Sequence, residues 1–555
     1  MGRLRTLPDA LTEAARADAG YTFVSARGEV FRSFADIRAA SMKVSGALRD
    51  AGLRRGDLVA LVLGDAEAFL TTLFGASMAG VIPASLYPPA PLGTARDLPR
   101  SLELTAGSLR ASGARAVVTT AALVPAFEGI RERCPALSLV LAQERLDAAL
   151  VEPDTLPGFD DIAFVQFTSG STSAPKGVAL SHANLSANID AINGPAGLMT
   201  TGEDVGVSWL PLNHDMGLVG MALGAVYAAR PCVLLPPQSF VKRPVEWLRA
   251  LTRHGGTISF APNFAYDLCV RRVKEGDLKG LDLSRWRVAG CGAEPVHPPT
   301  LAAFARKFAP AGFRETSFLP SYGLAEHVLA ATFAPRGRPL RTEHVSAHEL
   351  AGRRVAVPED REAMSLALAS CGSPLPGHTI EIVDEDGRPL PERHVGEILL
   401  AGPSVMRGYY QQEALTAETI RRGWLHTGDL GYVSGGELFV CGRVKDIIIA
   451  SGRKYHPQDL EWAVDDLAGV RRGRVVAFGA AGQGRADRVI MVVEPSGAVS
   501  AETLTETVRR RIGDVFGLYV DEVAIVPSGT VGRTTSGKVQ RAATKEKWAS
   551  LADRV

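Results

Sequence analysis

The stretch "QFTSGSTSAPKGV", from Gln166 to Val178, combines several hydroxyl side chains, two glycines and one lysine, and follows the apolar run "IAFV". Glycines let the backbone approach an oxyanion closely, and amides, hydroxyls and an ammonium group compensate its charge. The usual nucleotide loop needs Ser or Thr after its lysine, whereas Gly177 follows Lys176 here. The loop is a candidate phosphate site of another kind, with an ordinary surface loop as the alternative.

A second group of candidate residues follows two further predicted strands. "VAGCGAEPV" places small residues, Gly292 and Ala293 among them, after an apolar run, and "SYGLAEH" carries Tyr322 and Glu326. An aromatic ring can cover the flat face of a nucleobase. A carboxylate one turn away can hold Mg²⁺ on a triphosphate. Taken alone, Tyr322 is better interpreted as an ordinary core residue and Glu326 as a surface charge.

Two later motifs add groups suited to a sugar and a moving phosphate. "GWLHTGDLGYV" and "GRVKDIII" contain Asp429, expected on a tight turn that could chelate ribose hydroxyls, and Arg443, which could bond the same sugar. "GRTTSGKVQR" presents Lys538, a compact point charge. The alternatives are turn formers, ion-pair partners and a solvated lysine.

Alternating segments must position these residues. Helical patterns alternate with short Val/Leu/Ile runs through the first 330 residues, which favours parallel sheets covered by helices. After about residue 370, "TIEIVDEDGRPL", "GEILLAG" and "GELFVCGR" indicate a smaller β-rich subdomain, and the region from about Asp446 indicates a compact α+β domain. The charged segment between Phe333 and Cys371 is long for a connection, so it is either a functional insertion or a solvated excursion.

Length, composition and net charge limit the classes to which this protein can belong. With 555 residues, 46% hydrophobic residues and net charge +1, a globular chain of two or more domains without a nucleic-acid-binding surface is expected. The six scattered cysteines form no C-x-x-C pair, which argues against zinc and favours reduced thiols in the cytoplasm. The uncharged stretch from Ala68 to Ala95 is interpreted as a buried helix–strand unit, so no membrane span is expected. A loose myristoylation pattern at Gly2 and Thr6 is read as coincidence.

The motifs "FTSGSTSAPKGV", "GCGAEPV", "SYGLAE", "HTGDLG", "GRVKD" and "TTSGK" occur in one order, and in this combination the chain resembles the adenylate-forming superfamily. The resemblance implies an α/β multidomain fold. A large N-terminal domain, about 1–444, would hold two αβ-layered subdomains and a β-barrel-like one, with an insertion at about 334–370. A small mobile α+β domain, about 445–555, would follow.

The resemblance also assigns roles. His214, Glu326 and Lys538 would act in catalysis, Glu326 and Thr168 would hold Mg²⁺, and Lys445 and Asp446 would form the hinge. Lys538 would bridge carboxylate and phosphate, and His214 would lie between nucleotide and acyl tunnel. The ATP-binding residues would be Thr168, Ser169, Gly170, Ser171, Thr172, Lys176, Ala293, Glu294, Pro295, Tyr322, Gly323, Asp429, Arg443 and Lys538.

Several stretches, including "WLPLNHDMGL", "GRKYHPQDLE" and "SCGSPLPGHTIEIVD", look most like the fatty acyl-AMP ligases. That branch uses ATP and Mg²⁺ to activate a fatty acid, then passes the acyl group to the phosphopantetheine of an acyl carrier protein, and its insertion is associated with poor use of free coenzyme A. His327 and the wording "GRKYHP" depart from the branch's usual pattern and bear on substrate and acceptor preference.

Three alternatives remain. An acyl-CoA or aryl-CoA synthetase is the first. An amino-acid adenylation domain is disfavoured, because "LNHDMG" stands where that group carries its amine-binding aspartate. A catalytically silent scaffold is disfavoured by the presence of both Glu326 and Lys538.

Overall fold

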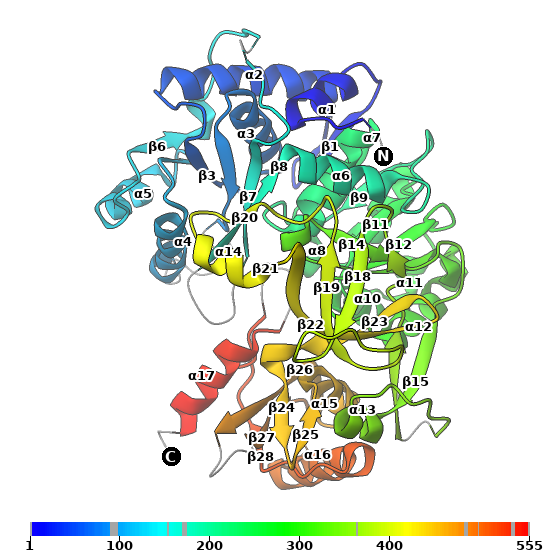
Figure 1. The fold of residues 1–555 in the computed structure, drawn as a ribbon. Helices are drawn as coiled ribbons and strands as arrows, with labels where there is room; N and C mark the ends of the chain where they lie inside the picture. Colours follow the sequence, from blue (N-terminus) through cyan, green and yellow to red (C-terminus); the bar gives the residue numbers. More distant parts are fainter. Residues whose placement is uncertain are drawn as a thin grey trace.

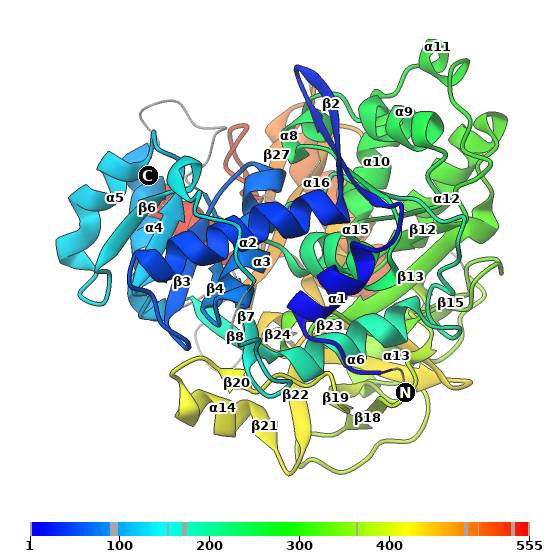
Figure 2. The ribbon, with the colours of Figure 1, turned by 90° about the horizontal axis from the view of Figure 1, so that it is seen from above.

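The computed structural model describes residues 3–88, 98–152, 155–168, 175–361, 364–481, 487–497, 499–533 and 539–552. Two large sheets lie side by side in its upper part, and a smaller group of elements, α15 to α17 and β24 to β28, lies beneath them (Figure 1). The two sheets also separate when seen from above, with β3 and β4 on one side and β12 and β13 on the other (Figure 2).

The first sheet has seven strands in the order β20-β8-β7-β4-β3-β5-β6, parallel from β7 to β6. Alternate residues of β3 point to opposite faces, so Val59 and Leu61 join the core under α2 and α3, while Ala60 and Val62 pack beneath α4 and α5. The elements are β20 (Gly408–Tyr409), β8 (Lys176–Ser181), β7 (Ile162–Thr168), β4 (Ile82–Ser85), β3 (Leu58–Val62), β5 (Ala116–Thr119), β6 (Leu139–Ala142), α2 (Phe34–Asp50), α3 (Ala66–Met78), α4 (Leu98–Ser112) and α5 (Val124–Ile130).

The second sheet has nine strands in the order β17-β14-β13-β12-β11-β9-β10-β1-β2, with a parallel centre. Its main helices are α6 (His182–Asn193), α9 (Val245–His254), α10 (Asn263–Arg272) and α12 (Pro298–Phe308). Its strands are β17 (Ser373–Pro374), β14 (Ala330–Phe333), β13 (Phe318–Gly323), β12 (Val288–Cys291), β11 (Ile258–Ala261), β9 (Gly206–Ser208), β10 (Cys232–Leu234), β1 (Gly20–Ser25) and β2 (Gly28–Ser33).

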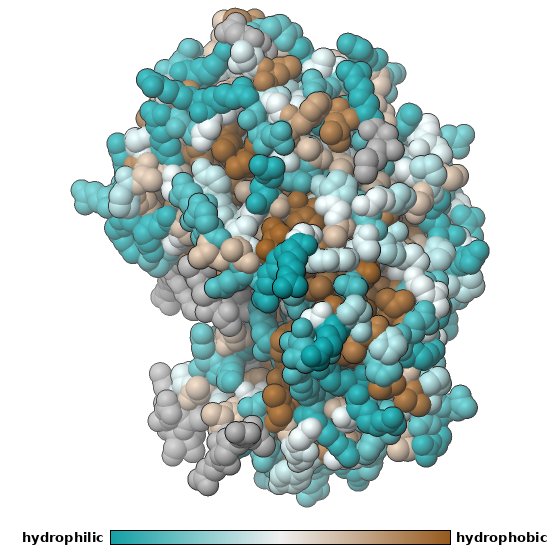
Figure 3. Space-filling model, in the orientation of Figure 1, coloured by the Kyte–Doolittle hydropathy of each residue, from teal (hydrophilic) through white to brown (hydrophobic). Residues whose placement is uncertain are grey.

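A third, antiparallel sheet forms the strand-rich region expected after residue 370. Its order is β18-β19-β22-β21, with β23 paired to β22. On the face of the molecule seen in Figure 3, apolar residues gather in a band across the middle, and hydrophilic residues cover most of the rest. The strands are β18 (Thr379–Val383), β19 (Gly396–Ala401), β21 (Ile420–Arg421), β22 (Trp424–Ser434) and β23 (Glu437–Arg443).

The charged segment after Phe333 has regular structure. It forms β15 (Thr342–Ser346), α13 (Ala347–Arg353) and β16 (Ser365–Ala369), with β15 and β16 paired antiparallel. Ala347 and Ala351 of α13 are buried in the same cluster as Ile448, Tyr455 and Phe516. The segment therefore packs against the C-terminal part of the chain and is not a solvated excursion.

The C-terminal elements surround a three-stranded sheet, β26-β27-β28. They are β24 (Ile448–Ala450), β25 (Arg453–Tyr455), α15 (Pro457–Asp465), β26 (Val470–Ala481), β27 (Asp487–Pro495), α16 (Ala501–Phe516), β28 (Glu522–Ile525) and α17 (Arg541–Ala552). The expected boundary between residues 444 and 445 stays a prediction.

Two further expectations concern membranes and thiols. Within the described residues, no helix combines the length and hydropathy that crossing a bilayer requires. The stretch beginning at Ala68 forms most of α3 and then β4, as predicted, although residues 89–97 lie outside the described part of the chain. All six cysteines are buried and unpaired.

Candidate active site

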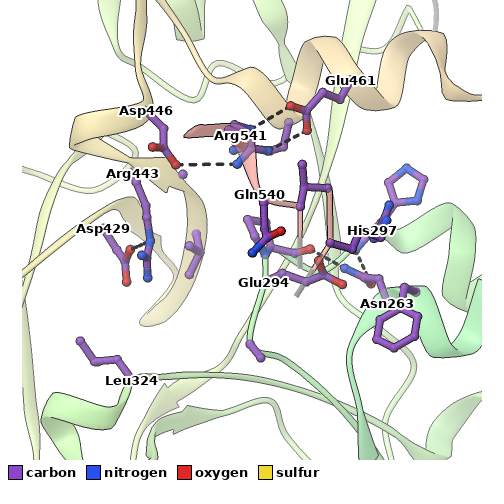
Figure 4. A pocket seen from close by; sticks show the side chains of 18 of the residues that line it. Asn263, Glu294, His297, Leu324, Asp429, Arg443, Asp446, Glu461, Gln540 and Arg541 are labelled. Carbon is purple, nitrogen blue, oxygen red and sulfur yellow. Dashed lines mark hydrogen bonds and ion pairs between the residues drawn. The ribbon is translucent and has the colours of Figure 1, made fainter. Parts of the chain in front are cut away.

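A cleft of about 2020 Å³ lies between the N-terminal sheets and the C-terminal elements. Figure 4 shows Asp429 and Arg443 on one side of it, Asn263 and Glu294 on the other, and Arg541 above them. The predicted site residues that line it are Lys176, His214, Ala293, Glu294, Pro295, Tyr322, Gly323, Glu326, Asp429, Arg443, Lys445 and Asp446. Residues from separate motifs therefore share one cavity.

The phosphate loop begins and ends on a hairpin. Thr168 ends β7 and pairs with Lys176, the first residue of β8. Ser169, Gly170, Ser171 and Thr172 lie outside the described residues, and so does Lys538. The roles predicted for these residues stay predictions.

Tyr409 links two of the predicted groups. Its hydroxyl donates a hydrogen bond to Glu326 Oε1 at 2.9 Å, and Lys176 Nζ lies 5.1 Å from the centre of its ring. Burial raises the pKa of Tyr409, and the Glu326 charge raises it further, so the hydroxyl keeps its proton. Sequence reasoning missed Tyr409, which sits in an ordinary "GYY" stretch and meets its partners only through the pairing of β20 with β8.

Tyr322, Asp429 and Arg443 form a connected group. Tyr322 Oη donates to Asp429 Oδ2 at 2.9 Å, and Arg443 Nε lies 2.8 Å from Asp429 Oδ1. Burial, and then the Asp429 charge, raise the pKa of Tyr322 well above its ordinary value. Asp429 is only 5% exposed, so this carboxylate is held in one orientation.

The expected tight turn at Asp429 is not present. Thr427 to Asp429 lie inside β22, where Gly428 has φ +68° and bends the strand. Asp429 pairs directly with Arg443 of β23, and this register brings the two side chains together. The prediction was wrong about the turn because a bent strand and a turn share the same Thr-Gly signal.

Asn263 holds the loop that follows β12. Its Nδ2 donates to the Pro295 carbonyl at 2.6 Å, and its Oδ1 accepts from the His297 amide at 3.0 Å. Ala293, in the same loop, has a left-handed φ of +71°. An alanine in this conformation needs support from its surroundings, which these hydrogen bonds supply. No sequence motif marked Asn263, because its partners lie about thirty residues further along the chain.

The close approach of two backbones shapes the neighbouring turn. A Cβ on Gly323 would lie 1.7 Å from the Leu329 carbonyl oxygen, so only glycine fits there. The turn that follows carries Glu326 into the cleft and His327 away from it into the core. Burial lowers the pKa of His327 to about 3, and its ring packs 4.9 Å from that of His378. His327 is thus a core residue of the turn.

His214 lies where an apolar part of the cleft begins. Its Nδ1 is 2.6 Å from Asp215 Oδ1, and Gln166 donates to the carbonyl of neighbouring Asn213 at 2.9 Å. The apolar lining includes Ile192, Met216, Phe260, Leu329 and Phe333. A chain of methylene groups would remove this surface from water.

The predicted hinge joins an ion-pair cluster. Arg541 of α17 makes two hydrogen bonds to Glu461 of α15, at 2.8 and 2.7 Å, and lies 3.7 Å from Asp446 Oδ2 (Figure 4). Burial, and then the charge of Arg443, lower the pKa of neighbouring Lys445. Sequence reasoning singled out the hinge pair but not Arg541, only three residues after Lys538.

The site also fits a magnesium ion. Across the described residues, no group of three or more His, Cys, Asp or Glu side chains has metal-binding geometry. A single carboxylate facing the cleft, here Glu326, suits Mg²⁺, which usually takes one or two carboxylates together with substrate phosphates and water.

The fold is that of an adenylate-forming enzyme, and the predicted nucleotide-binding residues of both large sheets line a cleft that also faces a small C-terminal α+β unit. The chain belongs to the AMP-binding enzyme family, whose model matches residues 11–410. A second model, described as the AMP domain of Disco-interacting protein 2-like proteins, matches residues 445–552.

Relatives of known name cover nearly the whole chain. A Caulobacter vibrioides protein named "Putative acyl-CoA synthetase" is 38% identical over 99% of this chain and 95% of its own. The medium-chain-fatty-acid–[acyl-carrier-protein] ligase JamA of Moorena producens is 33% identical over 86% of this chain and 83% of its own. A solved structure from work on fatty acyl-adenylate ligases of E. coli and L. pneumophila matches with TM-score 0.90 and 34% identity, covering both chains completely. This match confirms the predicted fold class.

Proposed function

We propose that this chain activates a fatty acid with ATP, releasing pyrophosphate, and passes the acyl group to the phosphopantetheine thiol of an acyl carrier protein. One observation carries the proposal: the groups suited to ATP and an apolar wall suited to an alkyl chain share one cleft. Relatives that act on fatty acids and carrier proteins support it. The proposal includes a cytoplasmic location and a boundary at 444/445.

The first step joins the fatty acid to AMP. A carboxylate oxygen attacks the α-phosphorus, and the bond to the bridging oxygen breaks as pyrophosphate leaves with the electron pair. Positioning and placed cations lower this barrier. Lys176 and Lys538 would bind the phosphates, and Asp429, aligned by Tyr322 and Arg443, would hold the ribose. Mg²⁺ held by Glu326 and Thr168 would neutralise phosphate charge.

The second step transfers the acyl group. The thiol sulfur attacks the acyl carbonyl carbon, AMP leaves with the electron pair of the broken C–O bond, and the thiol proton passes to water. A rotation at Lys445 and Asp446 would withdraw Lys538 and open a path for the thiol. This rotation must separate Arg541 from Asp446 or carry the two together.

Free coenzyme A is the second candidate acceptor. The relative from Caulobacter vibrioides, with its name of acyl-CoA synthetase, favours it. The packing of α13 against the C-terminal elements favours the carrier protein, since the resemblance links this insertion to poor use of coenzyme A. Both candidates share the adenylation step and differ only in the thiol.

One experiment separates the steps. The protein is incubated with ATP, Mg²⁺ and a pool of fatty and aromatic acids, and acyl-adenylates are identified by mass spectrometry. A phosphopantetheinylated carrier or coenzyme A is then added in parallel. Fatty acyl-AMP followed by carrier loading is expected. Efficient turnover of coenzyme A would show that coenzyme A, not the carrier protein, is the acceptor. If neither acyl-AMP nor pyrophosphate exchange is detected with any acid, the hypothesis of a catalytically silent scaffold would be favoured instead.

A further inference from the structure

The cleft is also lined by arginines that belong to none of the predicted nucleotide-binding motifs. We call six of them the arginine rim: Arg271 and Arg272 of α10, Arg306 of α12, and Arg471, Arg472 and Arg474 of β26. All but Arg474 are exposed. The rim combines three residues from the N-terminal part with three from the C-terminal part, in a chain whose net charge is only +1.

The two halves of the rim face each other. Burial lowers the pKa of Arg474. Glu494 opposes this shift, whereas the charges of Arg533, Arg471 and, across the cleft, Arg271 add to it. The rings of His297 and Trp462 lie 4.6 Å apart and join the same two parts. The rim is therefore one surface in this arrangement of the chain.

Positive charge exceeds negative charge along this surface. Arg271 pairs with Asp267 at 2.7 Å, and Arg471 lies 3.4 Å from Glu494. Arg272, Arg306 and Arg472 have no carboxylate within ion-pair distance in the part of the chain that the structure describes. Arg272 Nη1 donates to the Val241 carbonyl at 3.3 Å, and all three residues are exposed, so their charges can meet an anionic partner.

Local roles account for only part of the rim. Arg271, Arg272 and Arg306 stand in the last turns of α10 and α12, where cations offset the helix dipole. Arg471, Arg472 and Arg474 lie on a strand and have no such role. A bound anion would reduce the repulsion between like charges across the cleft.

Two anions could meet this surface, the phosphates of ATP and a phosphate-bearing thiol donor. The inner cleft already offers Lys176, Arg443 and Lys445 to the nucleotide. The exposed position of the rim suits a large partner that stays in solvent and sends only a narrow arm inward. Guanidinium groups also bind phosphate oxygens in pairs.

We propose that the arginine rim docks the carrier protein, binding the phosphodiester of its phosphopantetheine arm and the acidic surface around it. This inference rests on the proposed function and adds the surface that selects the acceptor. The halves belong to parts that the predicted hinge would move relative to each other. Docking across both halves therefore belongs to the arrangement seen here, and it precedes the rotation that opens a path for the thiol.

The test uses the three rim arginines that break no ion pair when replaced. Charge-reversal variants R272E/R306E and R472E are compared with control variants R16E/R27E and R510E, whose exposed arginines lie outside the cleft. Carrier loading is measured against carrier concentration, and binding of the phosphopantetheinylated carrier is measured directly. Pyrophosphate exchange and loading of neutral pantetheine report on the chemistry alone.

We expect the KM for the carrier to rise about tenfold in R272E/R306E and about threefold in R472E, with a weaker salt dependence than in the parent. Pyrophosphate exchange, the KM for ATP and loading of pantetheine should stay within about twofold. Weaker loading of free phosphopantetheine, which carries the same phosphate as a monoester, would place recognition on the phosphate of the arm. A loss seen only with the carrier would place it on the acidic surface. Both support docking.

Three results would overturn the inference. Carrier KM and binding equal to those of the controls would show that the rim does not dock the carrier. An equal rise in the KM for ATP would make the rim a nucleotide surface. If the parent protein makes acyl-AMP but loads only coenzyme A, the proposed function is wrong about the carrier protein. This failure differs from a failure of the docking inference, because it is seen in the parent protein without any substitution.

Discussion

At the scale of single residues, the site depends on side chains that join motifs to one another. Tyr409 touches both Glu326 and Lys176, so it fixes the relative position of two groups to which the proposed adenylation step gives a role. A residue that acts in this way contributes through its partners. Its removal should change the properties of those partners more than the stability of the fold.

Tyr409→Phe keeps the ring beneath Lys176 and removes the hydrogen bond to Glu326. A hydrogen bond to a charged group contributes about 1.5–3 kcal/mol, so we expect roughly a tenfold slower pyrophosphate exchange and a higher Mg²⁺ requirement. Exchange is titrated with Mg²⁺ at saturating ATP, and Tyr410→Phe is the control. An unchanged Mg²⁺ midpoint would contradict the positioning role.

Asn263→Ala should loosen the Ala293–Pro295 loop. The Pro295 carbonyl and His297 amide would each lose a partner, at a cost of about 1–3 kcal/mol. The KM for ATP should rise about tenfold, whereas the KM for the fatty acid should change little. Asn193→Ala, which removes comparable hydrogen bonds outside the cleft, controls for general destabilisation. Equal effects of the two variants on the KM for ATP would contradict the role of Asn263 in positioning this loop.

These residues show where sequence reasoning stopped. Lys176, Tyr322, Glu326 and Asp429 stand in short motifs whose composition indicates their chemistry, and all four line the cleft. Tyr409, Asn263 and Arg541 carry no local signal, because their importance comes from partners that only the folded chain brings near. A single sequence records composition and spacing, not tertiary pairing.

At the scale of elements, α15 carries a carboxyl group that should make stability depend on pH. Asp459 is 5% exposed, and burial, then the charge of Glu461, raise its pKa to about 8 while Arg541 opposes them. The folded state therefore binds a proton that the unfolded state releases near pH 4. The stability from this group is present in acid and is lost as pH rises through about 8.

Asp459→Asn mimics the protonated form and should remove this loss. The melting temperature of the variant minus that of the parent should grow between about pH 4 and pH 8, then level off, reaching several degrees. Asp514→Asn, at an exposed position on α16, is the control. A difference that does not vary with pH would show that Asp459 is ionised in the fold.

The helix α13 of the insertion could not be predicted from the periodicity of the sequence. The segment from Phe333 to Cys371 showed little periodicity because α13 is seven residues long and buries only Ala347, Leu350 and Ala351. Short elements give too few turns for a helical period to emerge. The β-rich region after residue 370 was predicted correctly, since its sequence consists of short apolar runs separated by turn residues.

Ala351→Asp should detach α13 from the C-terminal elements. Ala351 is 6% exposed in a cluster with Ile448 and Tyr455, so an introduced carboxylate would be buried at a cost of roughly 2 kcal/mol or more. We expect faster proteolysis near residues 444–447 and more use of coenzyme A. Arg353→Asp introduces a carboxylate at an exposed position of the same helix. Equal proteolysis rates in the two variants would show that the contact between α13 and the C-terminal elements does not hold these parts together.

At the scale of the whole molecule, the proposed mechanism divides the two reaction steps between two orientations of the C-terminal part. In the proposed mechanism Lys538 serves adenylation alone and leaves the site before the thiol enters. Lys538→Ala should then slow pyrophosphate exchange about a hundredfold or more, because it removes a charge aimed at the developing phosphoryl oxygens. Carrier loading from supplied acyl-AMP should proceed at nearly the parent rate.

Lys545→Ala is the matched control, since it removes an exposed lysine from α17, the helix that follows Lys538. Both half-reactions are followed by mass spectrometry of acyl-AMP and of the loaded carrier. Equal slowing of the two steps by Lys538→Ala would mean that this lysine stays at the site throughout. The two steps would then share one orientation, and the hinge at Lys445 and Asp446 would need another role.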